Sequence, residues 1–199
     1  MILIVRNGHA AARWGLGRVS AGPARLLPVP PGERTDFQRS LLRTVGGDAT
    51  PNVFATLLHN PALLDAWLPF CLKLLRHSAF PRRERELIIL RTAWLCRSDY
   101  EWYSHLSIGA RAGITDTEFR TLQLEPAEGA WTDRERALLQ AVRELYQTQD
   151  IGEATWVRMR AELSAEQLVE LPMLVGNYVL LAGVLNSLAV QPDTEEGTS

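Results

Sequence analysis

Apolar residues recur with helical spacing along most of the chain, and residues that typically begin or end helices bound each run. No segment sustains the strict alternation of a half-buried strand, so the pattern predicts an all-α fold. Pro51 and Pro61 each follow a Thr or Asn, where a first helical residue is expected. The capping-box pattern, a hydroxyl residue with Glu or Gln three positions later, begins at Ser98, Thr115, Thr132 and Ser164.

These signals predict eight or nine helices in a bundle. We expect them near residues 35–45, 51–59, 61–77, 81–97, 99–112, 116–124, 132–148, 153–163 and 165–189. Pro69 and Pro172 fall inside two of these segments, where they should kink or interrupt the helix. Gly113 lies where a helix should end, because glycine readily adopts the left-handed conformation of a helix C-cap.

The two ends of the chain differ in composition from the middle. Residues 1–32 contain arginines but no acidic residue and end in "LLPVPPG", so we expect an N-terminal arm that is extended or disordered. Residues 192–199 are polar and acidic, which is typical of a disordered tail. Residues 33–191 then form one helical domain, a length that suits a single core.

Composition narrows the classes of partner. The chain has 21 basic and 23 acidic side chains, so it lacks the charge excess of a protein that binds nucleic acid or a membrane surface. Its apolar runs are interrupted before the roughly 20 residues of a membrane span. Two cysteines cannot form the disulfide framework of a small secreted domain, so we expect a soluble, cytoplasmic protein. Lys73 is the sole lysine among many arginines, which suggests a bacterial source. Small molecules and other proteins remain as the expected binding partners.

Three ionisable residues are candidates for acid–base chemistry. Glu101 and His105 are four residues apart and share a helix face, which would let them exchange a proton directly or through one water. Glu86 lies in a mostly apolar run and needs a partner if it is buried; Arg82, Arg91 or a residue of the next helix could provide one. Structural alternatives exist for the first two, since Glu101 would complete a capping box and His105 could be a satisfied core histidine.

The cysteines and histidines give no sign of a metal site. Arg97 follows Cys96 and could lower the pKa of its thiol, but Cys96 more simply represents a buried thiol, and Cys71 a core residue. No pair of histidines or cysteines has the spacing of zinc ligands. We therefore expect neither a metal nor another cofactor.

The run "PRRERELIILRTAWLCRSDYEWYSHLSIGARAGITDTEF" resembles the carboxymuconolactone decarboxylase family, which includes the alkylhydroperoxidase D-like proteins. The similarity extends more weakly over residues 35–191. It implies an alkylhydroperoxidase D-like helical bundle that assembles as a dimer, trimer or hexamer. The peroxidase branch of the family carries CxxCxxxH, with a Glu twelve residues before the first Cys. Glu86 and His105 match that Glu and that His, whereas Ser98 and Glu101 occupy the two thiol positions.

The missing thiol pair makes the resemblance point to the thiol-free branch. It implies acid–base decarboxylation or isomerisation of a small organic acid or lactone. In this interpretation His105 is the general base or acid, with Glu101 as its partner and Glu86 as a relay. The candidates for substrate contacts are Arg91, Tyr100 and Trp102. Two alternatives stay open: an alkylhydroperoxidase or peroxiredoxin-type activity that uses Cys96, and a non-catalytic oligomeric binding protein.

Overall fold

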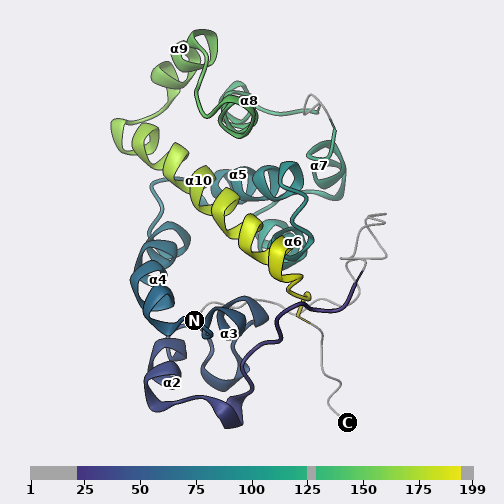
Figure 1. The fold of residues 1–199 in the computed structure, drawn as a ribbon. Coiled ribbons are helices and arrows are strands. Elements are labelled where there is room, and N and C mark those ends of the chain that lie inside the picture. The colour runs from purple at the N-terminus through teal and green to yellow at the C-terminus, as the bar shows by residue number, and fades with distance from the viewer. Residues whose placement is uncertain (1–21, 125–128, 194–199) are drawn as a thin grey trace.

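The computed structural model describes residues 22–124 and 129–193, and all regular secondary structure in these residues is helical (Figure 1). The prediction of an all-α fold is confirmed. The α-helices are α2 (Asp36–Leu42), α3 (Asn52–Leu57), α4 (Pro61–Arg76), α5 (Arg82–Leu95), α6 (Asp99–Arg111), α7 (Asp116–Thr121), α8 (Asp133–Thr148), α9 (Glu153–Glu162) and α10 (Ala165–Leu188). Two short 3₁₀ helices, η1 (Pro31–Glu33) and η2 (Gly47–Ala49), flank α2. Each α-helix ends within three residues of its predicted bounds.

Three of the four predicted capping boxes form, at Thr115, Thr132 and Ser164. The box predicted at Ser98 does not form. Its backbone N–H donates to the carbonyl of Ala93 in the preceding helix, at 2.9 Å, so the Glu101 side chain has no N-cap donor to accept from. Glu101 instead turns inward and is buried.

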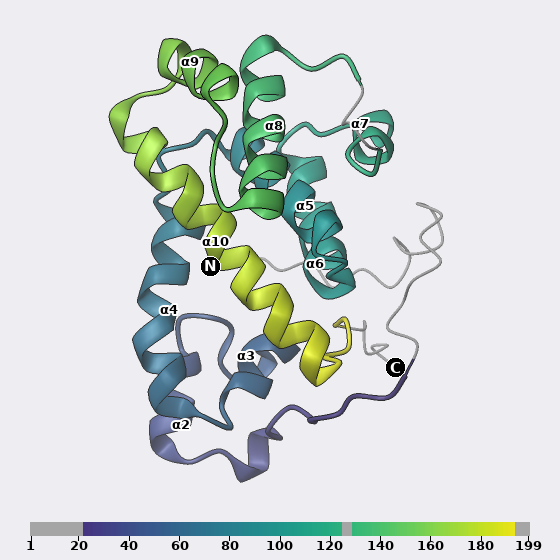
Figure 2. The ribbon, with the colours of Figure 1, turned by 45° about the horizontal axis from the view of Figure 1, so that its top comes forward.

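The two internal prolines do not interrupt their helices. Pro69 lies inside α4 and Pro172 inside α10, and both helices continue through them. α10 therefore runs for 24 residues across the molecule, past α4, α5 and α8 (Figures 1 and 2). It is long and apolar enough to span a membrane, but half of its apolar window is buried inside the protein, as in the core helix of a globular fold.

α5 lies at the centre of the packing and is buried on every side. It contacts α6, α8 and α10, and all residues from Glu86 to Ala93 are buried. A helix surrounded in this way needs no single apolar face. The core around it divides into three clusters: one between α5, α8 and α10, one among α2, α3, α4 and the end of α10, and one between α5, α6 and α7.

Both chain ends, as far as the structure describes them, are bound to the helical domain. Residues 22–30 have no regular secondary structure, and the backbone N–H groups of Arg25 and Val29 donate to the carbonyls of Leu188 and Ala55, at 2.9 and 3.0 Å. At the other end, the Asp193 carboxylate accepts a hydrogen bond from the Asn52 backbone at 2.8 Å. The rest of the predicted arm and tail, residues 1–21 and 194–199, lies outside the described residues.

Candidate active site

A tight turn between α5 and α6 sets up the site. The turn residue Arg97 has a φ of 53°, in the left-handed region, and the N–H of Ser98 bonds back to Ala93 as in a Schellman motif. An arginine in this conformation costs about 1–2 kcal/mol, which a glycine would avoid. The turn brings α6 back against α5, so that His105 faces Glu86.

His105 is held from both sides of its ring. Its Nδ1 lies 2.7 Å from Oε2 of Glu86 on α5, and its Nε2 lies 3.2 Å from the hydroxyl of Tyr178 on α10. The His105 and Tyr178 rings meet edge to face, with centroids 5.4 Å apart. A carboxylate on Nδ1 fixes the tautomer and orients Nε2, as in a catalytic triad.

Glu86 is fully buried, and two partners stabilise its negative charge. Its Oε1 accepts from Nε and Nη2 of Arg85, at 3.0 and 2.7 Å, while its Oε2 faces His105. Burial alone would raise the pKa of Glu86, but His105 and Arg85 outweigh it and hold the pKa below its usual range. The sequence suggested Arg82 or Arg91 as partner; the structure shows that the cation is Arg85, and His105 is the predicted partner from the next helix.

Glu101 is a buried carboxylic acid whose side chain has no basic residue as a hydrogen-bond partner in the described part of the chain. Its side chain is 2 % exposed, and neither carboxyl oxygen completes a hydrogen bond within the described residues. Burial raises the pKa of Glu101 well above its usual value; the nearby Ser98 hydroxyl opposes this shift without forming a well-aligned hydrogen bond. Glu101 therefore keeps its proton at a pH where an exposed glutamate has lost it.

Glu101 and His105 line one small cavity. Its volume is about 50 Å³, enough for water but well below the roughly 150 Å³ of an engineered cavity that holds benzene. The wall is mostly apolar and consists of Val53, Phe54, Trp67, Cys71, Leu75, Tyr100, Glu101, Ser104, His105, Tyr178 and Leu181. Glu86 lies behind His105 and reaches the cavity only through that ring.

Of the three residues predicted to contact the substrate, one lines the cavity and two lie elsewhere. Tyr100 lines the cavity. Trp102 does not; it is buried against Trp94, with ring centroids 5.6 Å apart. Arg91 does not line it either, because its Nη1 donates to the carbonyls of Leu122 and Leu124 at the end of α7, at 2.6 and 2.9 Å.

The two thiols occupy different places around Glu101. Cys71 lines the cavity from α4, whereas Cys96 caps the end of α5 and is half-buried. Burial, with a smaller effect of the Glu101 carboxyl, raises the pKa of each thiol to about 12. Little of either thiol is ionised at neutral pH. No cluster of three potential metal ligands occurs in the described part of the chain.

Sequence reasoning missed three residues of the site: Arg85, Cys71 and Tyr178. Arg85 was hidden among four charged residues at the start of α5, and Cys71 was predicted only as core. Tyr178 had a usable signal, because it and Asn177 are adjacent polar residues inside the apolar stretch of α10 that runs from Leu171 to Leu185. A buried tyrosine hydroxyl usually requires a partner, and here the partner is His105.

Comparison with known proteins fits this geometry. The sequence model described as Carboxymuconolactone decarboxylase family matches residues 61–144. This match supports the resemblance to the carboxymuconolactone decarboxylase and alkylhydroperoxidase D-like proteins over that part of the chain. The family segment begins with α4 and ends inside α8, so it contains Cys71, Glu86, Glu101 and His105, whereas Tyr178 lies beyond it. None of the curated proteins matches the chain in sequence.

Solved structures share the fold of this chain. An uncharacterised peroxidase-related protein from Ralstonia eutropha JMP134, with an alkylhydroperoxidase AhpD core, matches with a TM-score of 0.75 and 22 % identity over 88 % of this chain and 95 % of its own. A putative antioxidant defence protein AhpD from Agrobacterium tumefaciens matches with a TM-score of 0.64 and 18 % identity over 70 % of this chain and 96 % of its own. The debrominase Bmp8 matches with a TM-score of 0.61 and 15 % identity over 84 % of this chain and 91 % of its own. These similarities establish the alkylhydroperoxidase D-like bundle.

Proposed function

We propose that this protein is a cofactor-free acid–base enzyme that decarboxylates or isomerises a small organic acid or lactone. One observation carries the proposal: Glu101, a buried carboxylic acid, and His105, an imidazole oriented by a carboxylate, line the same mostly apolar cavity. A carboxylic acid that keeps its proton and an oriented imidazole can act as the proton donor and the proton acceptor of one reaction.

In an isomerisation, Nε2 of His105 removes a proton next to a carbonyl group of the substrate. The electron pair moves into the carbonyl to give an enolate, and Glu101 supplies a proton to the far carbon of the conjugated system. The proton taken up by His105 then returns to Glu101 through solvent. Glu86 stays ionised and stabilises the imidazolium that forms, while Arg85 balances the charge of Glu86. The Tyr178 hydroxyl lies 3.2 Å from Nε2 and must give up this contact before Nε2 accepts the substrate proton.

In a decarboxylation, the bond to the leaving carboxylate breaks, and its electron pair moves into a conjugated carbonyl. CO₂ departs, and Glu101 protonates the resulting enolate, so that one proton is consumed in each turnover. An apolar wall assists this step because a carboxylate is less stable there than the neutral CO₂ that it becomes. Solvent then reprotonates Glu101.

The proposal is tested by measuring CO₂ release and solvent-deuterium incorporation with a panel of small β-keto acids and unsaturated lactones. We expect His105→Gln to lower kcat/KM at least about 100-fold, the usual contribution of a general base, while circular dichroism shows an intact fold. His77→Gln, at an exposed position after α4, is the matched control and should keep full activity. Turnover retained by His105→Gln would remove this mechanism.

A thiol peroxidase is the second candidate, because Cys71 lines the same cavity and similar structures include peroxidase-related proteins. A crystal structure of a cysteine-to-alanine variant of the debrominase Bmp8 contains 2,3,4-tribromopyrrole. A peroxidase cycle needs a thiolate, and the pKa of about 12 at both Cys71 and Cys96 disfavours one. Mass spectrometry after mild peroxide treatment decides the matter: sulfenic acid at either cysteine supports the peroxidase, and two unmodified thiols argue against it.

A further inference from the structure

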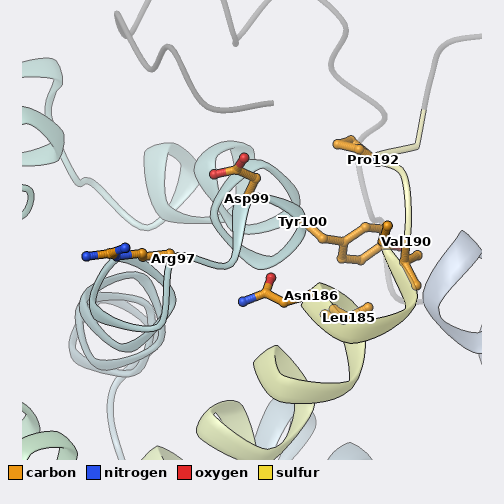
Figure 3. A pocket seen from close by; sticks show the side chains of 8 residues that line it. Arg97, Asp99, Tyr100, Leu185, Asn186, Val190 and Pro192 are labelled. Carbon is orange, nitrogen blue, oxygen red and sulfur yellow. The ribbon is translucent and has the colours of Figure 1, made fainter. Parts of the chain in front are cut away.

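A second, larger pocket lies beside the cavity of Glu101 and His105. It has a volume of about 200 Å³ and opens between the α5–α6 turn, the end of α10 and the segment that follows α10 (Figure 3). Its lining residues are Arg97, Asp99, Tyr100, Leu185, Asn186, Ala189, Val190 and Pro192. We call it the outer pocket and the 50 Å³ cavity the inner cavity.

Tyr100 is the one residue that lines both the outer pocket and the inner cavity. The two spaces are stacked along α10, since Leu181 lines the inner cavity and Leu185, one turn later, lines the outer pocket. In Figure 3 the Tyr100 ring extends from α6 toward Val190, among the other residues that line the outer pocket. Its ring is therefore the shared wall of the two spaces.

The segment that follows α10 holds the Tyr100 ring in place. The Tyr100 hydroxyl donates to Oδ2 of Asp193 at 2.7 Å and accepts from the backbone N–H of Val53 at 3.1 Å. The other oxygen of Asp193 accepts from the backbone of Asn52 at 2.8 Å. Asp193 thus latches the Tyr100 hydroxyl to the start of α3.

The outer pocket has a cation at its rim. Arg97 is exposed and lines the outer pocket from the left-handed turn; in Figure 3 its guanidinium extends away from Tyr100 and Asn186, so the side chain must turn to reach a ligand in the pocket. Asn186 commits its amide to the carbonyl of Cys96 at 3.0 Å, and Asp99 is the acidic group on the lining. A guanidinium at the rim suits a ligand with a carboxylate group.

We propose that the outer pocket is the entry site for an anionic substrate, bound by Arg97, and that the Tyr100 ring is the gate through which the substrate reaches Glu101 and His105. The two volumes support entry through the outer pocket first. An acid the size of one ring fits the outer pocket, but it fits the inner cavity only after the Tyr100 ring moves. Rotation of Tyr100 joins the two spaces, and release of Asp193 permits the rotation. The identity of the substrate rests on the proposed function; the gate does not.

The gate is tested without turnover, through the thiol of Cys71 in the inner cavity. In full-length protein carrying Cys96→Ser, Cys71 is the remaining cysteine, and its reaction with methanethiosulfonate reagents reports access to the inner cavity. We expect Tyr100→Ala to accelerate labelling by a benzyl reagent at least tenfold, and Asp193→Ala at least threefold. Tyr100→Phe, which keeps the ring and loses the latch, should behave like Asp193→Ala even if Tyr100→Ala does not fold.

Leu63→Ala, at an exposed position on α4 that lines neither space, is the matched control. Its labelling rate should change less than twofold. Unchanged labelling in Tyr100→Phe and Asp193→Ala, combined with faster labelling in Trp67→Ala, whose side chain lines the inner cavity from α4, would place the entrance on the α4 side and overturn the proposal.

Arg97 is tested by comparing an anionic sulfonatoethyl reagent with a cationic trimethylammonioethyl reagent at low salt. We expect the anionic reagent to be favoured in the Cys96→Ser protein and the preference to fall at least threefold in Arg97→Gln. Arg120→Gln, at an exposed position on α7, should leave the preference unchanged. An unaltered preference in Arg97→Gln would remove Arg97 from the entry site. Activity loss in His105→Gln is independent of these rates, so either proposal can fail alone.

Discussion

Nδ1 of His105 lies 2.7 Å from Oε2 of Glu86, across the interface of two successive helices. The contact assigns each carboxylate of the site a separate role. Glu86 is ionised and orients the imidazole, whereas Glu101, four residues before His105 and on the same face, is kept apart and protonated. The spacing of Glu101 and His105 predicts a shared face, and both side chains do line one cavity, yet the partner that binds His105 is Glu86.

Replacing Glu86 with glutamine should destabilise the protein strongly at neutral pH. Breaking a buried ion pair typically costs about 3–5 kcal/mol, because the remaining charge of Arg85 is left uncompensated. The pKa of Glu86 is lowered on folding, so its contribution is complete above about pH 4.3 and is lost as the pH falls through the folded-state pKa. Urea denaturation of Glu86→Gln from pH 7 downward should show the difference from the wild type shrinking. Glu153→Gln, at the exposed start of α9, should shift stability by less than about 0.5 kcal/mol.

Replacing Glu101 with glutamine should have the opposite pH dependence. The pKa of Glu101 is raised on folding, so above about pH 4.3 the unfolded chain releases a proton that the folded protein keeps, and stability falls as the pH rises. This penalty grows by about 1.4 kcal/mol per pH unit while the folded carboxyl stays protonated. Glu101→Gln removes it, so its stability relative to the wild type should rise between pH 5 and pH 7. Parallel pH profiles of the two proteins would show that Glu101 is ionised in the fold; Glu166→Gln, exposed on α10, is the control.

Arg91 should prove important for stability and unimportant for substrate affinity. It is fully buried, and its guanidinium donates to two carbonyls at the end of α7, each contact being worth about 1.5–3 kcal/mol for a charged donor. We expect Arg91→Leu to lower the free energy of unfolding by about 3 kcal/mol, with KM unchanged at temperatures where the variant is folded. Arg120→Leu, exposed on α7, should be nearly neutral. A raised KM in folded Arg91→Leu would restore the sequence-based prediction of a substrate contact.

The exposed side of α10 should mediate self-association, which stays a prediction from the family resemblance. Val169, Met173 and Leu180 are 68, 51 and 58 % exposed and continue with Gly176 and Gly183 in alternating steps of four and three residues, the spacing of a helix that packs on its own copy. We expect analytical ultracentrifugation to find an oligomer at micromolar concentration, and Met173→Glu to dissociate it. Ser187→Glu, one turn beyond the apolar stretch, should weaken it less. A monomeric wild type would contradict this prediction.

Most of the fold could be read from the sequence because its signals are local. Proline at N1, the capping boxes at Thr115, Thr132 and Ser164, and a glycine at position 113 each act within a few residues, and each fixes a helix end. The capping box at Ser98 fails because a second local signal, the turn after α5, competes for the same backbone N–H. The backbone N–H of Ser98 was already committed to α5 by the turn, which no inspection of "SDYE" alone reveals.

The site was harder to predict because its contacts cross between helices. The pairing of Glu86 with Arg85 depends on which way a long side chain bends, and Tyr178 reaches His105 from a helix 73 residues away. The cavity itself depends on the volumes of eleven side chains from four helices. Helical spacing can place Glu101 and His105 on one face, but it carries no information about what packs opposite that face.

The difference in sequence separation also bears on how the site assembles during folding. The Glu86–His105 contact closes a loop of 19 residues between neighbouring helices, whereas the Tyr178–His105 contact closes one of 73. Short loops close at lower entropic cost, so the α5–α6 hairpin can form its Glu86–His105 contact early, and α10 then docks onto an imidazole that is already oriented. Slowing the arrival of α10, rather than the formation of the hairpin, would therefore delay the appearance of a competent site.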